Sequence, residues 1–273
     1  MPLSSAIGAT AATLAGASMT SMDLNADLGE SFGRWTLGDD ERLVAHITSA
    51  NLACGFHAGD FRVMEVTVAI CRRAGVAVGA QPGYPDLIGF GRRPMAYEPD
   101  EVESLVRYQI GALEAFCRAN GVEMQHVKPH GALYNQAATD PALAAGIAKA
   151  TARFSRSLAL YGLASSAPMA AAAEDAGLRF VPEAFADRQY VSDGTLQPRS
   201  EPNSLLDAPA EAAAQAVSIA VDGQVIAADG TAVALRAESI CCHGDTPGAV
   251  EIAASVRRAL DDAGVVVSAL GAP

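Results

Sequence analysis

The feature that most constrains the fold is a unit that recurs along the chain: a short apolar strand, a polar cluster where the strand ends, and then a helix. Strands are predicted at residues 23–28, 48–53, 76–80, from 126 onward, 157–161, 178–182 and 238–242. Helices are predicted at residues 41–47, 61–74, 99–120, 140–154, 168–176 and 210–220, and from the Asp245–Pro247 turn to about 263. Because strands that alternate with helices pair in parallel through right-handed crossovers, the chain is predicted to be a β/α protein.

Two β/α architectures compete, a doubly wound open sheet and a closed barrel. Open sheets of this kind often bind nucleotides through a glycine-rich turn, but the chain has neither a GxGxxG nor a Walker sequence. Polar residues follow nearly every predicted strand, and in a barrel all these strand ends surround one mouth. We therefore expect a (β/α) barrel of about seven strands, with a small hairpin formed by residues 224–227 and 232–235.

Charge and cysteine usage narrow the classes of function. The 19 basic and 31 acidic residues give a net charge of −12, which repels nucleic acid and anionic lipid. Five cysteines without paired spacing argue against a disulfide framework and a zinc knuckle, and favour a reducing compartment. No stretch reaches the roughly 20 apolar residues of a membrane span. We expect a cytoplasmic protein with no nucleic-acid or membrane partner.

Residues 1–21 differ from the rest of the chain. They are mostly Ala, Ser, Thr and Gly with no Lys or Arg, so they lack the basic region of a signal peptide and the arginines of a transit peptide. We expect a disordered N-terminal extension over residues 1–21, followed by a single barrel domain over residues 22–273.

The first predicted strand has the highest density of candidate functional residues. Asp23, Asn25, Asp27 and Glu30 alternate with apolar residues or begin the loop that follows. Asp23 lies at the start of the strand, far from the expected mouth, so its role is expected to be structural. The other three residues are expected at the mouth.

The second and third strands end in a histidine and in an arginine pair. His57 follows the second strand, and the adjacent Asp60 is either a substrate ligand or the N-cap of the next helix. The loop over residues 81–94 is too long and too rich in Gly and Pro for a simple connector. Its arginines Arg92 and Arg93 suit an anionic group, although only one of them need contact it.

The fourth strand ends in Lys128, Pro129 and His130. A lysine at a buried strand end is costly unless an anionic group pairs with it, so Lys128 is expected to have such a partner. His130 is expected to be functional, whereas His126 is expected to be a core residue.

The last two strand ends add Asp187, Arg188, His243 and Asp245, and a proline-rich loop over residues 194–209 places Arg199 at the expected rim. Asp187 and Arg188 have an alternative explanation as a surface ion pair worth about 0–1 kcal/mol. Asp245 has an alternative explanation as a helix cap before Pro247.

Two chemistries fit this set of residues. In one, a carboxylate and a histidine activate water while Lys128 and Arg92 stabilise negative charge. In the other, histidines join Asp27 on a divalent metal, although no compact ligand motif such as HExxH is present. The predicted catalytic residues are Asp27, His57, Lys128, His130 and His243. The predicted substrate-binding residues are Asn25, Glu30, Asp60, Arg92, Asp187, Arg188 and Asp245.

Six motifs in order give the chain a family resemblance. They are DLNADLGESFG at 23–33, SANLACGFHAGD at 49–60, GYPDLIGFGRR at 83–93, HVKPHGALYN at 126–135, FADRQY at 185–190 and HGDTPGA at 243–249. From about residue 22 to 267 the chain resembles the LamB/YcsF family, which comprises the A subunit of the bacterial ATP-dependent 5-oxoprolinase. The resemblance implies a barrel similar to the glycoside hydrolase/deacetylase superfamily.

The resemblance also implies an activity and partners. It implies cleavage of the lactam 5-oxo-L-proline to L-glutamate, coupled to ATP hydrolysis, in a complex with subunits B and C. Because the chain has no nucleotide loop of its own, the subunit that binds ATP is left open, as are a divalent metal and a homo-oligomer. One departure is Gln81, where the family usually has His, and an amide neither titrates near neutral pH nor binds metals well.

Two other functions are kept as alternatives. One is a metal-dependent carbohydrate deacetylase, suggested by the barrel and the scattered His and Asp residues. The other is a binding subunit that delivers a lactam to its partners without chemistry of its own. Within the lactam-opening hypothesis, Asp27 or His57 is the candidate base, and the substitution at Gln81 favours Asp27 as a base over Asp27 as a metal ligand.

Overall fold

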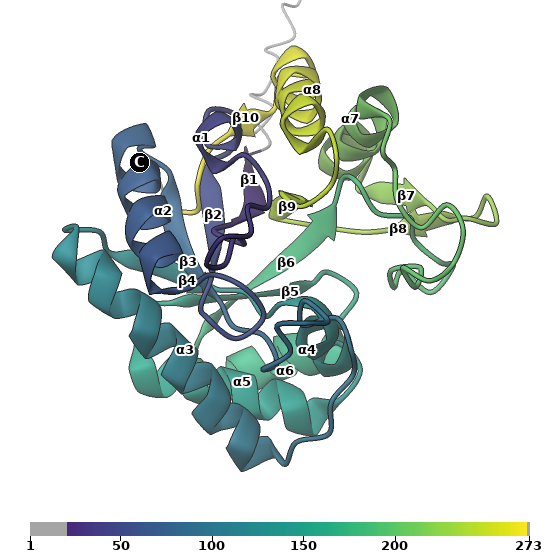
Figure 1. Ribbon diagram of the computed structural model, residues 1–273. Helices are drawn as coiled ribbons and strands as arrows, with labels where there is room; N and C mark the ends of the chain where they lie inside the picture. Colours follow the sequence, from purple (N-terminus) through teal and green to yellow (C-terminus); the bar gives the residue numbers. More distant parts are fainter. Residues whose placement is uncertain (1–20, 272–273) are drawn as a thin grey trace, which may run out of the picture.

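The computed structural model describes residues 21–271, and its centre is a closed barrel of seven parallel strands (Figure 1). The strands are β1 (Ser21–Leu28), β2 (Ser49–Ala53), β3 (Ala77–Gln81), β4 (Met124–Val127), β5 (Ala159–Leu163), β6 (Arg179–Phe185) and β9 (Ser239–Cys242). Each strand pairs with the next, and β9 pairs with both β6 and β1, which closes the ring. The predicted seven-stranded barrel is confirmed, and the open sheet is excluded.

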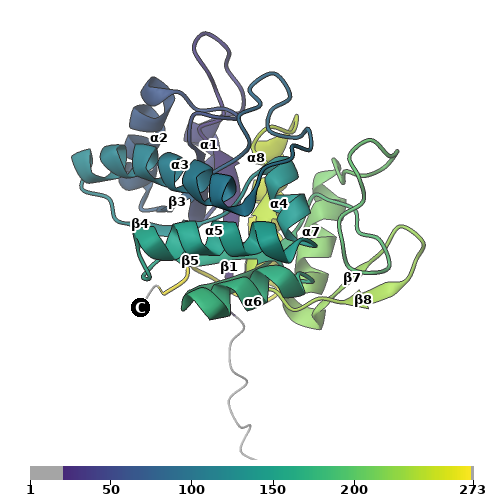
Figure 2. The same ribbon diagram turned by 90° about the horizontal axis from the view of Figure 1, so that it is seen from below.

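The helices surround the ring of strands, except for α4, which lies at the mouth of the barrel. They are α1 (Asp40–Leu43), α2 (Phe61–Ala74), α3 (Pro99–Ala119), α4 (Gly131–Ala137), α5 (Pro141–Phe154), α6 (Ala167–Ala176), α7 (Pro209–Val217) and α8 (Ala249–Asp262). Helices α3, α5 and α6 lie side by side along one flank (Figure 2), and α7 packs against α8. No helix within residues 21–271 is long and apolar enough to cross a membrane.

Some elements differ from the sequence-based expectation. The predicted extension over residues 1–21 lies outside the described residues except for Ser21, which begins β1. The predicted hairpin forms as β7 (Gln224–Ile226) and β8 (Ala232–Ala234), whereas β10 (Val266–Val267), which pairs with β1, was not predicted. The helix predicted at 210–220 divides into α7 and a π-helical turn η1 (Ser218–Asp222). The helix predicted at 41–47 is shortened to α1.

Local capping explains where two of the longer helices begin and end. The Asp60 carboxylate accepts hydrogen bonds from the backbone N–H groups of Arg62 and Val63 at the start of α2, and Gly75 ends that helix with a left-handed φ of 70°. Helix α3 begins with a capping box between Glu98 and Glu101. The loops that shape the mouth run into the starts of α2 and α3, and these caps fix the loops at those points.

Apolar and polar side chains alternate along strand β1, so one set faces the helices and the other faces the inside of the barrel. Leu24, Ala26 and Leu28 belong to the apolar core between the strands and the helices. The alternate polar residues face the inside of the barrel, where most β/α barrels place branched apolar side chains. This barrel therefore has a polar interior, and each buried polar group in it needs a hydrogen-bond partner.

At the end of the barrel away from the mouth, Asp23 satisfies this requirement. Its carboxylate accepts hydrogen bonds from the hydroxyls of Ser49 (2.6 Å), Tyr161 (3.0 Å) and Ser239 (2.5 Å), which come from β2, β5 and β9. The Asn25 amide, one layer higher, also donates to the Ser239 hydroxyl at 2.7 Å. The structure supports the structural role predicted for Asp23, because its carboxylate joins four strands.

His126 also belongs to this interior. It is fully buried, and its Nε2 donates to the Asn51 side-chain oxygen at 2.7 Å. Its ring lies so close to Gly79 on β3 that a Cβ at that position would collide with it. The prediction that His126 is a core residue rather than a functional one is supported by this packing.

Candidate active site

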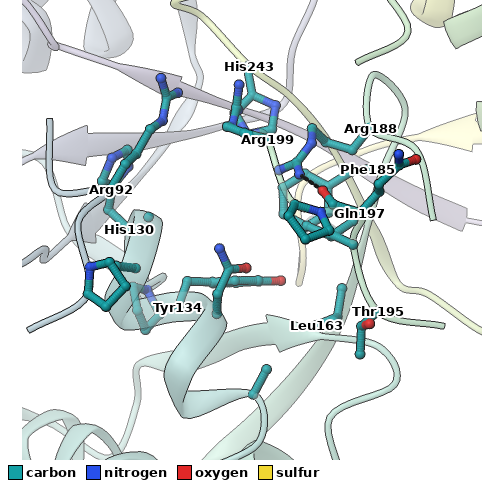
Figure 3. A pocket seen from close by; sticks show the side chains of 18 of the residues that line it. Arg92, His130, Tyr134, Leu163, Phe185, Arg188, Thr195, Gln197, Arg199 and His243 are labelled. Atoms are coloured by element: carbon teal, nitrogen blue, oxygen red, sulfur yellow. Dashed lines mark hydrogen bonds between the residues drawn. The ribbon is translucent and has the colours of Figure 1, made fainter. Parts of the chain in front are cut away.

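A cavity of about 570 Å³ lies at the carboxyl ends of the barrel strands (Figure 3). Loops after β3, β4, β6 and β9 build its walls, as expected where all strand ends surround one mouth. Seven of the residues predicted from the sequence line it: Asp27, Arg92, Lys128, His130, Arg188, Arg199 and His243. The strand ends thus converge as the sequence indicated, although the roles of individual residues differ.

The floor of the cavity is a buried ion-pair network around Lys128. Its ammonium lies 3.0 Å from Asp27 Oδ1 and 2.9 Å from Glu183 Oε1, and it contacts the Cys241 sulfur at 2.9 Å. Although burial alone would lower it, the pKa of Lys128 is raised well above its usual value by Asp27 and the other anionic groups. Lys128 was predicted to have an anionic partner, and it has two, the carboxylates of Asp27 and Glu183.

The same network makes Asp27 a weak base. Burial would raise the pKa of its carboxyl, but the adjacent Lys128 ammonium holds that pKa below the ordinary range. A general base works best with a pKa near the working pH, so an ionised and strongly paired carboxylate accepts protons poorly. The position of Asp27 suits charge stabilisation and the orientation of Lys128, and its role as the base stays a prediction.

Beside the floor, Glu30 and two histidines form a second cluster. Glu30 Oε1 lies 3.7 Å from His57 Nε2 and 3.7 Å from His130 Nδ1. The two imidazole rings stack in parallel with their centroids 3.8 Å apart, between the backbones of Gly83 and Gly91. His130 Nε2 donates to the Phe90 carbonyl at 2.9 Å, which leaves the Nδ1 lone pair of the neutral ring directed toward Glu30.

Burial shifts the pKa values of all three groups in the direction that disfavours their charged forms. Burial lowers the pKa of His57 to about 4, and burial together with His57 lowers the pKa of His130 well below its usual value. Burial and the neighbouring Asp27 raise the pKa of Glu30 well above its usual value. Within residues 21–271, Glu30 Oε1 and both nitrogens of His57 lack hydrogen-bond partners. Three converging groups with unused lone pairs are uncommon in a folded protein.

These three residues have the donor set of a metal site. Glu30, His57 and His130 each offer one ligand atom, and the three atoms lie within 4.8 Å of one another. Two neutral imidazoles and one carboxylate form a three-ligand set found in catalytic zinc sites, and the Phe90 carbonyl orients one ligand from behind. The residues fit a divalent metal. The metal-binding carboxylate would be Glu30 rather than Asp27, which the sequence had suggested.

Gln81 is buried at the end of β3, beside His57. Neither its amide oxygen nor its amide nitrogen has a hydrogen-bond partner within the described residues. Gln81 is not one of the three residues Glu30, His57 and His130 that form the possible metal site. That site therefore needs no titrating side chain at position 81.

On the opposite side of the cavity, Asp187 and His243 form a hydrogen-bonded pair. The His243 Nδ1 donates to the Asp187 carboxylate at 2.9 Å, and the His243 backbone N–H donates to the same carboxylate at 2.8 Å. Burial would raise the pKa of Asp187, but His243 holds it below the usual value. The carboxylate therefore fixes the ring, whose Nε2 has no protein partner in the described part of the chain. Asp187 fixes the orientation of His243 and, within the described residues, forms no ion pair with Arg188; its contact with substrate stays a prediction.

The two arginines after β3 have separate roles. Arg92 reaches the cavity and pairs with Asp245 at 2.7 Å, whereas Arg93 forms an ion pair with Asp86 that fastens the loop over residues 81–94. Asp245 does not cap the last helix, because α8 begins at Ala249 after Gly248. Of the predicted pair, only Arg92 lies at the cavity.

Two residues predicted to bind substrate occupy other positions. Asp60 caps α2 and also accepts a hydrogen bond from the Gly33 backbone at 2.6 Å, so the capping alternative describes it. Asn25 is fully buried one layer below the cavity floor, where its amide donates to Glu183 at 2.9 Å. Hydrogen bonds within the protein occupy both side chains, and their predicted contact with substrate stays a prediction.

Sequence reasoning missed the role of Glu183 and of Tyr134, whose hydroxyl donates to Glu183 at 2.8 Å. The strand was predicted to end at residue 182, which placed Glu183 in a loop, but β6 continues to Phe185 and brings Glu183 into the barrel. The available signal was alternation, because Glu183 and Phe185 follow Val181 with a period of two.

Fold and site together define a seven-stranded β/α-barrel protein with a polar, arginine-rich cavity at the strand ends. The chain belongs to the LamB/YcsF family, whose model matches residues 22–272.

Relatives within the family share nearly the whole chain. It is 54% identical over 251 residues to a protein of Symbiobacterium thermophilum named as the A subunit of 5-oxoprolinase, covering 92% of this chain and 96% of that relative. It is 50% identical over 252 residues to the protein of the same name from Bacillus subtilis, covering 92% and 98%. A crystal structure of a lactam utilization protein from Thermus thermophilus matches with a TM-score of 0.86 and 48% identity, covering 92% of this chain and 100% of that chain.

Proposed function

We propose that the protein is the component of an ATP-dependent 5-oxoprolinase in which the lactam ring is opened. The observation that supports this most strongly is the Asp187–His243 pair at a cationic cavity, in a chain 54% identical to a protein named as the A subunit of 5-oxoprolinase. The substrate would be 5-oxo-L-proline and the product L-glutamate. The name of the relatives supports partner subunits, which we take to be subunits B and C.

His243 has the geometry of a general base for this reaction. Its Nδ1–H is held by the Asp187 carboxylate, so the lone pair of a neutral ring is on Nε2, which faces the cavity. When water attacks the ring carbonyl carbon, its proton passes to Nε2. When the ring C–N bond breaks, that proton passes to the ring nitrogen, which leaves as an amine. One imidazole can perform both transfers, and such proton transfer contributes roughly 10²–10⁴-fold.

The negative charge of the carbonyl oxygen and of the phosphoryl group that it receives needs fixed cations. Lys128 lies on the cavity floor with its charge maintained by Asp27 and Glu183, and Arg92 lies on the adjacent wall. Preorganised cations stabilise such charge without reorganising during the reaction. Because an amide is unreactive, ATP would first phosphorylate the carbonyl oxygen and leave as ADP. Attack by one water and cleavage of the ring C–N bond then leave a glutamyl phosphate, and a second water splits it into glutamate and phosphate. The chain has no glycine-rich phosphate turn, so we assign ATP binding to the partner subunits.

The Glu30, His57 and His130 cluster supports a second candidate, a metal-dependent hydrolase. A divalent ion held there would act as a Lewis acid toward the carbonyl oxygen of the substrate. Purified protein should then contain stoichiometric metal, and chelation should abolish its activity. Full glutamate formation by protein without metal would exclude this candidate.

Reconstitution tests the main proposal. The chain is mixed with subunits B and C, ATP and 5-oxo-L-proline, and glutamate and phosphate are measured with and without this chain. We expect glutamate only when all three subunits are present. Asp27→Asn and His130→Ala should each lower turnover, with Lys149→Met on the exposed face of α5 as a control. Full turnover in either site variant would show that the site is assigned wrongly.

A further inference from the structure

We propose that Arg188 and Arg199 form the site that receives the carboxylate of the substrate, so that the cavity selects lactams bearing an acidic group over neutral lactams. This inference rests on the proposed function, because it takes the ligand to be a small cyclic amide. Both residues line the cavity on the wall formed by the loops after β6 (Figure 3).

Arg188 is a buried cation whose protein partners are neutral. It is 4% exposed, its Nε donates to the Ser204 carbonyl at 3.2 Å, and its Nη2 donates to the Gln197 carbonyl at 2.6 Å. Within residues 21–271, no carboxylate oxygen lies within 4.0 Å of its nitrogens. Burial and the neighbouring Arg199 lower the pKa of Arg188 to about 10. A buried charge of this kind is costly unless an anion compensates it.

Arg199 presents a second guanidinium without an ion-pair partner in the described residues. It is half-buried on the loop between β6 and α7, and it lines the same cavity as Arg188 and His243 (Figure 3). Burial and the charge of Arg92 lower the pKa of Arg199, which shows that these cations lie close enough to repel one another. The protein thus places like charges together, an arrangement that a bound anion would stabilise.

The other cations of the cavity are already neutralised. Arg92 pairs with Asp245 at 2.7 Å, and Lys128 pairs with Asp27 at 3.0 Å. The carboxylate nearest to Arg188 along the chain, Asp187, is occupied by His243. Within residues 21–271 neither Arg188 nor Arg199 has a carboxylate in direct contact, so an anionic group of the ligand would be their first direct ion-pair partner.

The geometry of Arg188 indicates a carboxylate. The two backbone carbonyls hold Nε and one hydrogen of Nη2, which fixes the plane of the guanidinium and leaves Nη1 and the remaining Nη2 hydrogen for the ligand. A planar, fixed fork suits a planar carboxylate, and Arg199 adds a second donor group. With the carboxylate held on this wall, the ring carbonyl of a small lactam would reach toward Lys128 and His243, the groups proposed to act on it.

A pair of ligands that differ only in the carboxylate tests this inference. Calorimetry on the full chain, alone and with its partner subunits, compares L-5-oxoproline with 2-pyrrolidinone, the same ring without the acid. We expect Arg199→Gln to weaken binding of L-5-oxoproline by about tenfold to a hundredfold and to leave binding of 2-pyrrolidinone unchanged. Arg42→Gln, at an exposed ion pair with Glu251, is the matched control. Arg188→Gln should have the larger effect, and circular dichroism would show whether this buried variant folds.

The outcomes separate this inference from the proposed function. Unchanged affinity of the Arg199→Gln protein for L-5-oxoproline would overturn the inference, as would wild-type protein that binds both lactams equally. Binding of inorganic phosphate that depends on Arg199, without binding of L-5-oxoproline, would overturn the assignment to a carboxylate. If Arg199 is needed for L-5-oxoproline binding but the reconstituted mixture forms no glutamate, the carboxylate site stands and the proposed function fails.

Discussion

Replacing Lys128 with Met should destabilise the protein strongly, because this residue is the centre of the buried network. The Lys128 ammonium lies 3.0 Å from Asp27 and 2.9 Å from Glu183, and all three side chains are 5% exposed or less. Methionine keeps much of the volume but leaves two carboxylates buried without a cation. Removing one partner of a buried ion pair costs about 3–5 kcal/mol. We therefore expect the free energy of unfolding at pH 7 to fall by about 3–5 kcal/mol.

The loss should depend on pH in a defined direction. In the wild-type protein the pKa of Asp27 is below its unfolded value of about 3.9, so this carboxylate stabilises the fold above that pH and loses its effect as the pH falls through the folded pKa. Without Lys128, burial remains and raises the pKa of Asp27 and of Glu183. Their protonated forms then support the fold at low pH, and stability is lost as the pH rises. The difference between wild type and variant should therefore shrink from pH 7 toward pH 4.

Urea unfolding followed by circular dichroism at pH 7, 6 and 5 measures this difference. Lys149→Met is the matched control, since Lys149 is exposed on α5, and its effect should stay within about 0.5 kcal/mol. A loss below about 1 kcal/mol at pH 7 for Lys128→Met, comparable to that of an exposed ion pair, would refute the account of the floor as a buried network. A loss that grows as the pH falls would refute the sign of the pKa argument.

Three more variants test the rest of the structure. Gly91→Ala would place a Cβ 2.8 Å from the His57 Cβ and 2.9 Å from the His130 Cδ2 at a φ of 66°, so it should cost about 1–3 kcal/mol in urea unfolding; an unchanged midpoint would contradict the packing. Glu30→Gln should raise the Kd for Zn²⁺ by at least about tenfold in calorimetry, whereas equal affinity would remove Glu30 from the metal site. Asp60→Ala should lower stability by about 0.5–2 kcal/mol with normal glutamate formation, and a loss of turnover at full stability would restore its predicted substrate role.

The barrel could be predicted because its signals are local. Each strand, its polar exit and the following helix lie within a short stretch, and the capping residue Asp60 and the helix end at Gly75 can be read from neighbouring positions. The sequence also predicts that Lys128 has an anionic partner, since burying an unpaired ammonium is too costly. Its identity as Asp27 and Glu183 depends on which strands face one another across the barrel, a property of closure and strand tilt that no local pattern contains.

Residue roles at the mouth were harder to predict for the same reason. Asp187 precedes Arg188 in the sequence, yet it pairs with His243, which follows the neighbouring strand β9. Glu30 was expected to bind substrate, but the turns after β1, β2 and β4 bring it against two histidines. A side chain at a strand end can turn toward the cavity, its neighbours or a helix, and packing across the mouth decides between these directions.

The central claim is that His243, held by Asp187, transfers protons during opening of the lactam. Its most direct test is the single-turnover rate of glutamate formation in the reconstituted complex with the His243→Asn variant. His46→Asn is the control, because His46 precedes β2 and lies outside the residues that line the cavity. We expect the His243 variant to lose about 10²–10⁴-fold in rate with little change in substrate affinity, while the control keeps the wild-type rate. A His243→Asn complex that turns over at the wild-type rate would contradict the account.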